Sequence, residues 1–220
     1  MKTESELLSR CREIEGFTIG QLATQLRCVI PTESLQRKGW AGGLIEKALG
    51  TEAGNQSLPD FITLGIELKT LPMSATGEPA ESTFVTSIPL LTLHQQTWET
   101  SHCYAKLKRV LWLPIEADPS IPYAHRRIGR GILWSPSFDE ESILANDWTE
   151  LSQMLMLGKI HEVHAGLGMY LQVRPKAANA KSLCYGLDEQ GQKILTLPRG
   201  FYLRRSFTTY MINKHRIQSE

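Results

Sequence analysis

The chain has 220 residues, of which 41% are hydrophobic and 21% are charged, and its formal net charge is +1. These proportions are typical of a soluble globular protein, and no apolar run approaches the roughly 20 residues that cross a bilayer. The first residues include acids and form no uninterrupted apolar segment, so we expect no secretory signal and a cytoplasmic location. The four cysteines lie far apart without a CxxC spacing, which argues against a disulfide framework and a zinc ribbon.

The first fifty residues are predicted to be helical. Thr18 is expected to cap a helix over residues 19–26, and another helix is predicted over residues 40–49, with Gly50 ending it. The second of these helices carries one acid, Glu46. An acid on a helix is usually only a solvated side chain, so its significance depends on the segment that follows.

The middle of the chain predicts β-strands. Four stretches combine apolar residues with strand-like spacing: 61–71, 82–88, 108–115 and 127–134. The turn residues between the first two stretches suggest that these strands are antiparallel neighbours.

The last third of the chain predicts a long helix, a hairpin and a terminal helix. Asp139 is expected to cap the long helix, and Ser206 is expected to begin the terminal one. Residues 159–173 alternate like a β-hairpin, in which His161 and His164 would lie on opposite faces and make a poor metal pair. Helices followed by strands interleaved with helices predict an α/β fold, with a mixed β-sheet flanked by helices.

The segment over residues 58–70 carries the clearest chemistry. Its apolar residues alternate with polar ones, so a half-buried strand would present Glu67 and Lys69 together on its outer face. Asp60 precedes them and needs only a turn to join them. Two carboxylates can hold Mg²⁺ beside a phosphate, while an ammonium orients the attacking water or stabilises the developing negative charge. The spacing therefore predicts a metal-dependent nuclease centre.

Positive charge is concentrated near the C-terminus. Residues 174–216 contain nine Lys and Arg against two acids, so this segment carries +7 and the remainder of the chain −6. Such a segment would attract DNA phosphates, and the alternative interpretation is a solvated basic face.

Several segments, which together span most of the chain, carry a resemblance to a known family. They are Lys38-Gly-Trp-Ala-Gly with Glu46 and Gly50, Gly65-Ile-Glu-Leu-Lys-Thr70, Thr97-Trp-Glu-Thr-Ser-His102, Lys106-Leu-Lys-Arg-Val-Leu-Trp112, Arg174-Pro-Lys-Ala-Ala-Asn-Ala180 and Leu197-Pro-Arg-Gly-Phe-Tyr202. The Pro-Asp and Glu-x-Lys pattern resembles the catalytic core of the restriction-endonuclease-like superfamily. In this order, the segments resemble the MutH family of DNA mismatch repair endonucleases, whose relatives include Sau3AI-type restriction enzymes.

The resemblance implies a monomeric, Mg²⁺-dependent endonuclease that acts on double-stranded DNA. It would nick the unmethylated strand at hemimethylated GATC sites, 5′ to the G. The implied partners are the MutL ATPase, which activates the nuclease, and MutS, which acts indirectly after finding a mismatch. The implied fold has two lobes that form a DNA cleft, a catalytic lobe over about residues 1–110 and mainly a recognition lobe over about 111–220.

The resemblance also implies catalytic roles for single residues. Asp60 and Glu67 match the metal-binding acids, and Glu46 matches an additional acid, so that one or two Mg²⁺ ions would bind. Lys69 matches the active-site lysine. Lys106 matches a second lysine, acting on the scissile phosphate or the water, although an exposed lysine before a buried strand is the alternative.

For DNA recognition, the matching positions are Arg174, Lys176 and Tyr202, with Pro175 for apolar contact. Arginine and lysine suit guanine O6 and N7 in the major groove, and a tyrosine near adenine N6 offers a way to sense the methyl group. Tyr202 could equally be a core aromatic of a strand. Weaker candidates for DNA contact are Lys38, Phe84 and Arg199.

Two other functions fit parts of the sequence. A standalone GATC restriction endonuclease would cut both strands and would need two active sites, whereas the chain has one copy of the motif. A non-catalytic DNA-binding module would typically lack the acids or the lysine, and all of them are present. Strand-selective nicking is therefore the leading hypothesis.

Overall fold

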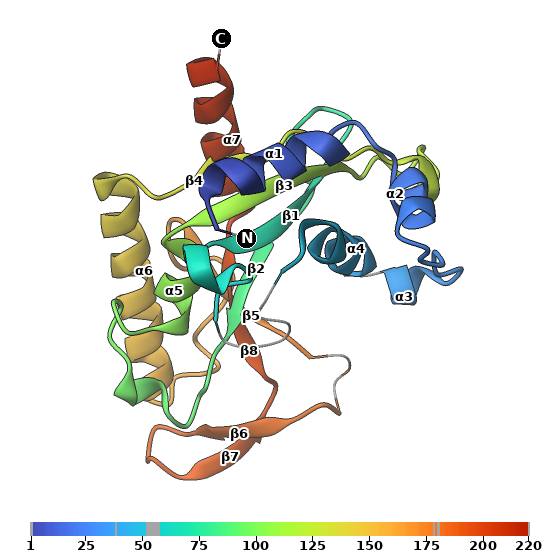
Figure 1. Cartoon of the computed structure of the whole chain (residues 1–220). Helices are drawn as coiled ribbons and strands as arrows, with labels where there is room; N and C mark the ends of the chain where they lie inside the picture. The colour runs from blue at the N-terminus through green and yellow to red at the C-terminus, as the bar shows by residue number, and fades with distance from the viewer. Residues whose placement is uncertain (1, 38, 52–57, 178, 180, 220) are drawn as a thin grey trace. The chain divides into compact units, whose positions relative to one another are not determined.

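The computed structural model describes residues 2–37, 39–51, 58–177, 179 and 181–219 (Figure 1). The chain forms two compact units, each built from two separate stretches of sequence. The first unit comprises Met1–Ala80 and Lys108–Ser135, and the second comprises Glu81–Leu107 and Pro136–Glu220. The chain therefore leaves the first unit, builds part of the second, and returns.

The first unit consists of a small mixed sheet with helices packed against it. Its helices are α1 (Glu4–Ile14), α2 (Ile19–Gln25), α3 (Ser34–Arg37) and α4 (Trp40–Leu49). Its strands are β1 (Glu67–Met73), β3 (Val110–Glu116) and β4 (Ile132–Trp134), in the order β1-β3-β4. Strand β3 pairs in parallel with β1 and antiparallel with β4, so this sheet is mixed, although the described residues form several small sheets and not the single mixed sheet that was expected.

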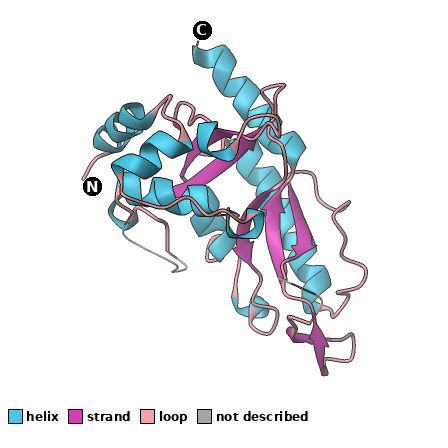
Figure 2. Cartoon of the chain, turned by 90° about the vertical axis from the view of Figure 1, so that its right-hand side faces the viewer, coloured by secondary structure: helices cyan, strands magenta, loops and turns pink. Residues whose placement is uncertain are grey.

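The second unit contains an antiparallel sheet, a separate two-stranded ribbon and three α-helices within the described part of the chain. Its helices are α5 (His102–Leu107), α6 (Phe138–Met156) and α7 (Arg205–Ser219). Its strands are β2 (Thr83–Ser87), β5 (Leu171–Pro175), β6 (Cys184–Leu187), β7 (Lys193–Thr196) and β8 (Arg199–Leu203). The sheet order is β2-β8-β5, and the β6-β7 ribbon extends beyond the end of this sheet (Figure 2).

Two helix starts follow from capping boxes. Thr18 accepts a hydrogen bond from the backbone N–H of Gln21 and caps α2, as expected. The long helix α6 is capped by Ser137, whose partner in the box is Glu140, so the expectation that Asp139 is the cap was wrong. Among the described residues, no helix is both long and apolar enough to span a membrane.

The expected antiparallel pairing of the first two strands was wrong. A turn does form after β1, where the N–H of Ser74 donates to the carbonyl of Glu78 at 2.8 Å. The pairing stops at an isolated bridge between Met73 and Pro79, because proline has no N–H with which to extend a ladder. Strand β2 instead pairs with β8 in the other unit.

The hairpin expected over residues 159–173 was also wrong. Residues 159–170 form turns, and only β5 pairs as a strand. The buried carboxylate of Asp147 accepts the N–H groups of Met169, Tyr170 and Leu171 at 2.8, 2.6 and 2.8 Å. A carboxylate on α6 thus replaces a partner strand as the acceptor for this part of the backbone.

Candidate active site and nucleic-acid interface

A tight reversal before β1 brings Asp60 beside the start of the strand. Phe61 and Ile66 form an antiparallel bridge, and Gly65, with φ +65°, supplies the left-handed residue that the reversal needs. Asp60 is buried, and its Oδ2 accepts the N–H of Leu68 at 2.8 Å. The turn that the sequence required between Asp60 and the Glu-x-Lys motif is therefore present.

Glu67 and Lys69 form an ion pair at the start of β1. The Lys69 Nζ lies 2.9 Å from the Glu67 Oε1, and the two side chains are only 10% and 6% exposed. The sequence predicted their common side of the strand, but it placed them on a solvated outer face, whereas Glu67 is buried. Burial makes the ammonium important, because an ionised carboxylate away from water needs an opposite charge or hydrogen bonds.

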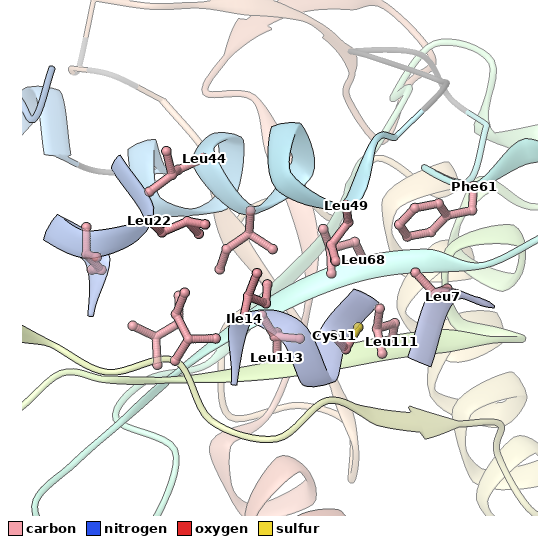
Figure 3. Close-up of a cluster of buried hydrophobic side chains, with 14 of the residues drawn as sticks. Leu7, Cys11, Ile14, Leu22, Leu44, Leu49, Phe61, Leu68, Leu111 and Leu113 are labelled. Atoms are coloured by element: carbon pink, nitrogen blue, oxygen red, sulfur yellow. The ribbon is translucent and has the colours of Figure 1, made fainter. Parts of the chain in front are cut away.

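The opposite side of β1 faces the hydrophobic core of the first unit. Leu68, between the two charged residues, packs in a cluster with Leu7 of α1, Leu49 of α4 and Leu111 of β3 (Figure 3). A slip of one residue would place Lys69 in this apolar cluster and move Leu68 to the side of the strand that carries the ion pair. The core therefore fixes the side of the sheet on which Glu67 and Lys69 lie.

The third predicted acid, Glu46, lies near the end of α4, the helix that packs against β1. Its carbonyl accepts the N–H of Gly50, which ends the helix at φ +72° as expected. Among the described residues, no three His, Cys, Asp or Glu side chains are grouped closely enough to hold a metal ion. A metal-binding role for Glu46 thus stays a prediction.

Lys106 belongs to the second unit and not to the one that contains Asp60 and Glu67. It lies in the last turn of α5, a short helix that the sequence analysis did not anticipate. Its action on the scissile phosphate also stays a prediction.

Four of the predicted DNA-binding residues meet in the sheet of the second unit, and we call them the recognition cluster: Phe84, Arg174, Lys176 and Tyr202. Phe84 lies opposite Tyr202 across β2 and β8, with the two rings edge to face and their centroids 5.3 Å apart. The Lys176 Nζ lies 3.1 Å from the centroid of the Phe84 ring, and the Arg174 guanidinium lies 5.8 Å from that of Tyr202. Two cations are therefore each placed against an aromatic ring.

Tyr202 is half-buried in this cluster. Burial raises the pKa of its hydroxyl, although the charge of Arg174 opposes that shift. A tyrosine hydroxyl already keeps its proton at neutral pH, and the upward shift of the pKa acts in the same direction, so the group can donate a hydrogen bond as well as accept one.

The remaining candidates lie elsewhere. Strand alternation directs Arg199 to the face of β8 opposite Tyr202, and burial lowers the pKa of its guanidinium. Pro175, at the exposed end of β5, lies opposite Arg199 in the register. Lys38 lies outside the described residues.

Two residues of this site were missed by the sequence analysis. Ser82 accepts a hydrogen bond from the Arg174 Nη1 at 2.7 Å, and nothing in the local sequence indicated it. Gly200 lies beneath the rings, where an added Cβ would come within 2.9 Å of Phe84 and 3.3 Å of Tyr202. The sequence could have indicated Gly200, because a glycine within a strand often marks a place where another part of the molecule packs closely against the backbone.

Comparisons with known proteins agree with these features. A sequence model of the family described as DNA mismatch repair enzyme MutH matches residues 49–147. The chain is 47% identical over 214 residues to the DNA mismatch repair protein MutH of Escherichia coli O9:H4 (strain HS), an alignment that covers 97% of this chain and 93% of the relative. With the same coverage, it is 48% identical to the proteins of that name from Escherichia coli O127:H6 (strain E2348/69 / EPEC) and Escherichia coli O1:K1 / APEC. The chain therefore belongs to the MutH family of DNA mismatch repair enzymes, endonucleases that nick hemimethylated GATC sites.

Proposed function

We propose that Asp60, Glu67 and Lys69 form the centre with which this MutH-family endonuclease nicks the unmethylated strand at hemimethylated GATC sites, 5′ to the G. The observation that carries the proposal is the buried Glu67–Lys69 pair, with the Asp60 carboxylate bonded to the intervening backbone N–H. Burying carboxylates and a lysine costs folding free energy, which apolar side chains at the same positions would not. A group of buried charges that is kept despite this cost is typical of a functional site.

The donor set fits Mg²⁺. Asp60 and Glu67 supply the carboxylate oxygens that this cation prefers, and no sulfur or imidazole ligand belongs to the proposed set. Glu46 is proposed as a further carboxylate, contributed by α4. When bound, the ion would polarise the scissile phosphate and lower the pKa of a bound water.

The residues of the chain divide the remaining tasks. Asp60 and Glu67 hold negative charge at fixed positions, because the backbone bond to Leu68 and the ion pair to Lys69 restrain their carboxylates. We assign Lys69 to stabilising the negative charge that develops on the phosphate or to orienting the attacking water, and Lys106 to a supporting role at the phosphate.

The recognition cluster is proposed to read the DNA bases. Arg174 and Lys176 carry donors suited to guanine O6 and N7, and Tyr202 is assigned to adenine N6, where the added methyl group projects into the major groove. Phe84 supports this interpretation, because its ring contacts both Lys176 and Tyr202. Lys38, Pro175 and Arg199 are secondary contacts in the proposal.

Activation is proposed to come from the MutL ATPase after MutS has found a mismatch, with this protein working as a cytoplasmic monomer on double-stranded DNA. A monomer with one centre cuts one strand per encounter, in keeping with a nick.

The Asp60→Asn variant tests the proposed centre. Asparagine keeps an oxygen for the Leu68 N–H and removes the charge, so nicking should fall by about a hundredfold or more while duplex binding persists. The matched control is Asp118→Asn, which removes a carboxylate from the exposed 118–120 turn of the same unit and should nick normally. Undiminished nicking by Asp60→Asn would place the metal elsewhere.

A further inference from the structure

The Arg174 side chain is exposed at the end of β5, yet it is held at two points. Its Nη1 donates to the Ser82 Oγ at 2.7 Å, and its guanidinium lies 5.8 Å from the centroid of the Tyr202 ring. An exposed arginine normally samples many rotamers, and confining it costs side-chain entropy. A hydrogen bond from a charged donor opposes this cost and selects one orientation.

Ser82 lies just before β2, two residues ahead of Phe84, so both residues face the same side of the sheet. Phe84 contacts Lys176 and Tyr202, while Ser82 holds Arg174. One short segment, residues 82–84, thus contacts all three residues that are assigned to the bases, although β5 and β8 carry two of them and Lys176 follows β5.

We propose that Ser82 is a positioning residue for base recognition, whose hydroxyl fixes the direction in which Arg174 presents its guanidinium to a guanine. The inference rests on the base-reading role proposed above for Arg174. Arginine has five N–H donors in a planar fork, so the bond to Ser82 occupies one of them and sets the plane of the others. Bidentate recognition of O6 and N7 depends on that plane, whereas contact with a phosphate tolerates many orientations.

The test measures kcat/KM for nicking of a hemimethylated GATC duplex and of duplexes with one altered base pair. The specificity ratio between the two should fall about tenfold in Ser82→Ala, because the bond that directs Arg174 is lost. Ser82→Thr keeps the hydroxyl and should restore the ratio. Ser87→Ala is the matched control, since Ser87 is the exposed last residue of β2, the strand that follows Ser82, and the variant should leave the ratio unchanged.

Combination with Arg174→Ala shows whether Ser82 acts through Arg174. The double variant should have the specificity ratio of Arg174→Ala alone. A further loss in the double variant, an unchanged ratio in Ser82→Ala, or a Ser82→Thr variant as defective as Ser82→Ala would each overturn the inference. An equal decline of cutting at all sites would overturn it too, because it would mark Ser82 and Arg174 as contributors to phosphate binding.

The Arg174→Ala variant separates an error in the proposed base-reading role of Arg174 from an error in the role of Ser82. If Arg174→Ala retains the wild-type specificity ratio, the base-reading role of Arg174 is wrong and the Ser82 inference falls with it. If Arg174→Ala loses the ratio and Ser82→Ala does not, only the role of Ser82 is wrong.

Discussion

The Nζ of Lys69 lies 2.9 Å from the Oε1 of Glu67, and both side chains are almost entirely buried at the start of β1. The two residues are adjacent on one side of β1 because Leu68 between them is anchored in the core of the first unit. Their geometry therefore depends on hydrophobic packing on the far side of the strand. The ion pair couples the position of a metal-type carboxylate to that of the lysine proposed to act on the phosphate.

Replacing Lys69 should impair chemistry more than binding. Lys69→Met removes the ammonium while keeping an unbranched side chain, so kcat for nicking should fall by about 10²–10³-fold with a small change in KM. Lys108→Met is the control, because Lys108 is an exposed lysine just before β3, the strand that pairs with β1. Thermal unfolding measured in parallel identifies misfolding, and a kcat within about threefold of wild type in a folded variant would remove Lys69 from the mechanism.

Tyr202→Phe tests how the adenine methyl group is sensed. The ring contacts with Phe84 and Arg174 are retained, and only the hydroxyl is lost. Discrimination between hemimethylated and fully methylated GATC should weaken by about tenfold in nicking assays, since one hydrogen bond at the adenine is removed. If discrimination is unchanged, the hydroxyl has no part in sensing the methyl group.

Gly200→Ala should disturb the recognition cluster without touching the catalytic centre. The added Cβ would come within 2.9 Å of the Phe84 ring and 3.2 Å of the Thr86 carbonyl, so the rings must move. We expect nicking of GATC duplex to fall by about tenfold, mainly through KM. Thr86→Ser, on the neighbouring strand β2, is the control, because it changes a side chain without changing the backbone and should leave KM unchanged. A normal KM for Gly200→Ala would show that the ring positions do not matter for binding.

Parts of the local structure around the proposed centre could be predicted from the sequence, because they depend on neighbouring residues. The alternation around Glu67 reports which side of the strand meets the core, and Thr18 and Gly50 mark helix ends through the hydrogen bonds and the backbone conformation that they allow. These signals involve residues close together in the chain. The burial of Glu67, in contrast, could not be predicted, because it depends on packing rather than on local spacing.

The predictions from the sequence were wrong where residues far apart in the chain determine the structure. Residues 159–173 look like a hairpin by alternation, but the carboxylate of Asp147 supplies the acceptors for their backbone. The turn after β1 was correctly placed, yet the partner of β1 is β3, some forty residues further on. The Ser82–Arg174 bond joins residues 92 positions apart, for which a single sequence holds no signal.

The link between α6 and α7 should weaken in acid. Burial of Glu140 opposes its ionisation, but the hydrogen bonds from Lys214 and Ser137 outweigh it, so the pKa of the carboxyl lies below its ordinary value of 4.5. A lowered folded-state pKa stabilises the protein above that ordinary value, and the contribution is lost as the pH falls through the folded-state pKa. Glu140→Gln keeps the capping box with Ser137 and removes the charge.

Thermal unfolding as a function of pH measures this contribution. At neutral pH, Glu140→Gln should be less stable than wild type by on the order of 1 kcal/mol, and the difference should vanish below the folded-state pKa. Glu141→Gln, a neighbouring acid in the same first turn of α6, is the control. A difference that persists unchanged in acid would mean that charge on Glu140 does not stabilise the fold.

Nicking of GATC duplexes in three methylation states, with Mg²⁺ and with MutL present or absent, measures whether this chain is a strand-selective nuclease and whether Asp60 belongs to its catalytic centre. The unmethylated strand of hemimethylated duplex should be cut 5′ to the G, fully methylated duplex should stay intact, and MutL should accelerate the cut. Asp60→Asn should be inactive under the same conditions. Cleavage of fully methylated duplex at the same rate would show that nicking does not depend on methylation, and persistent cutting by Asp60→Asn would show that Asp60 is not part of the catalytic centre.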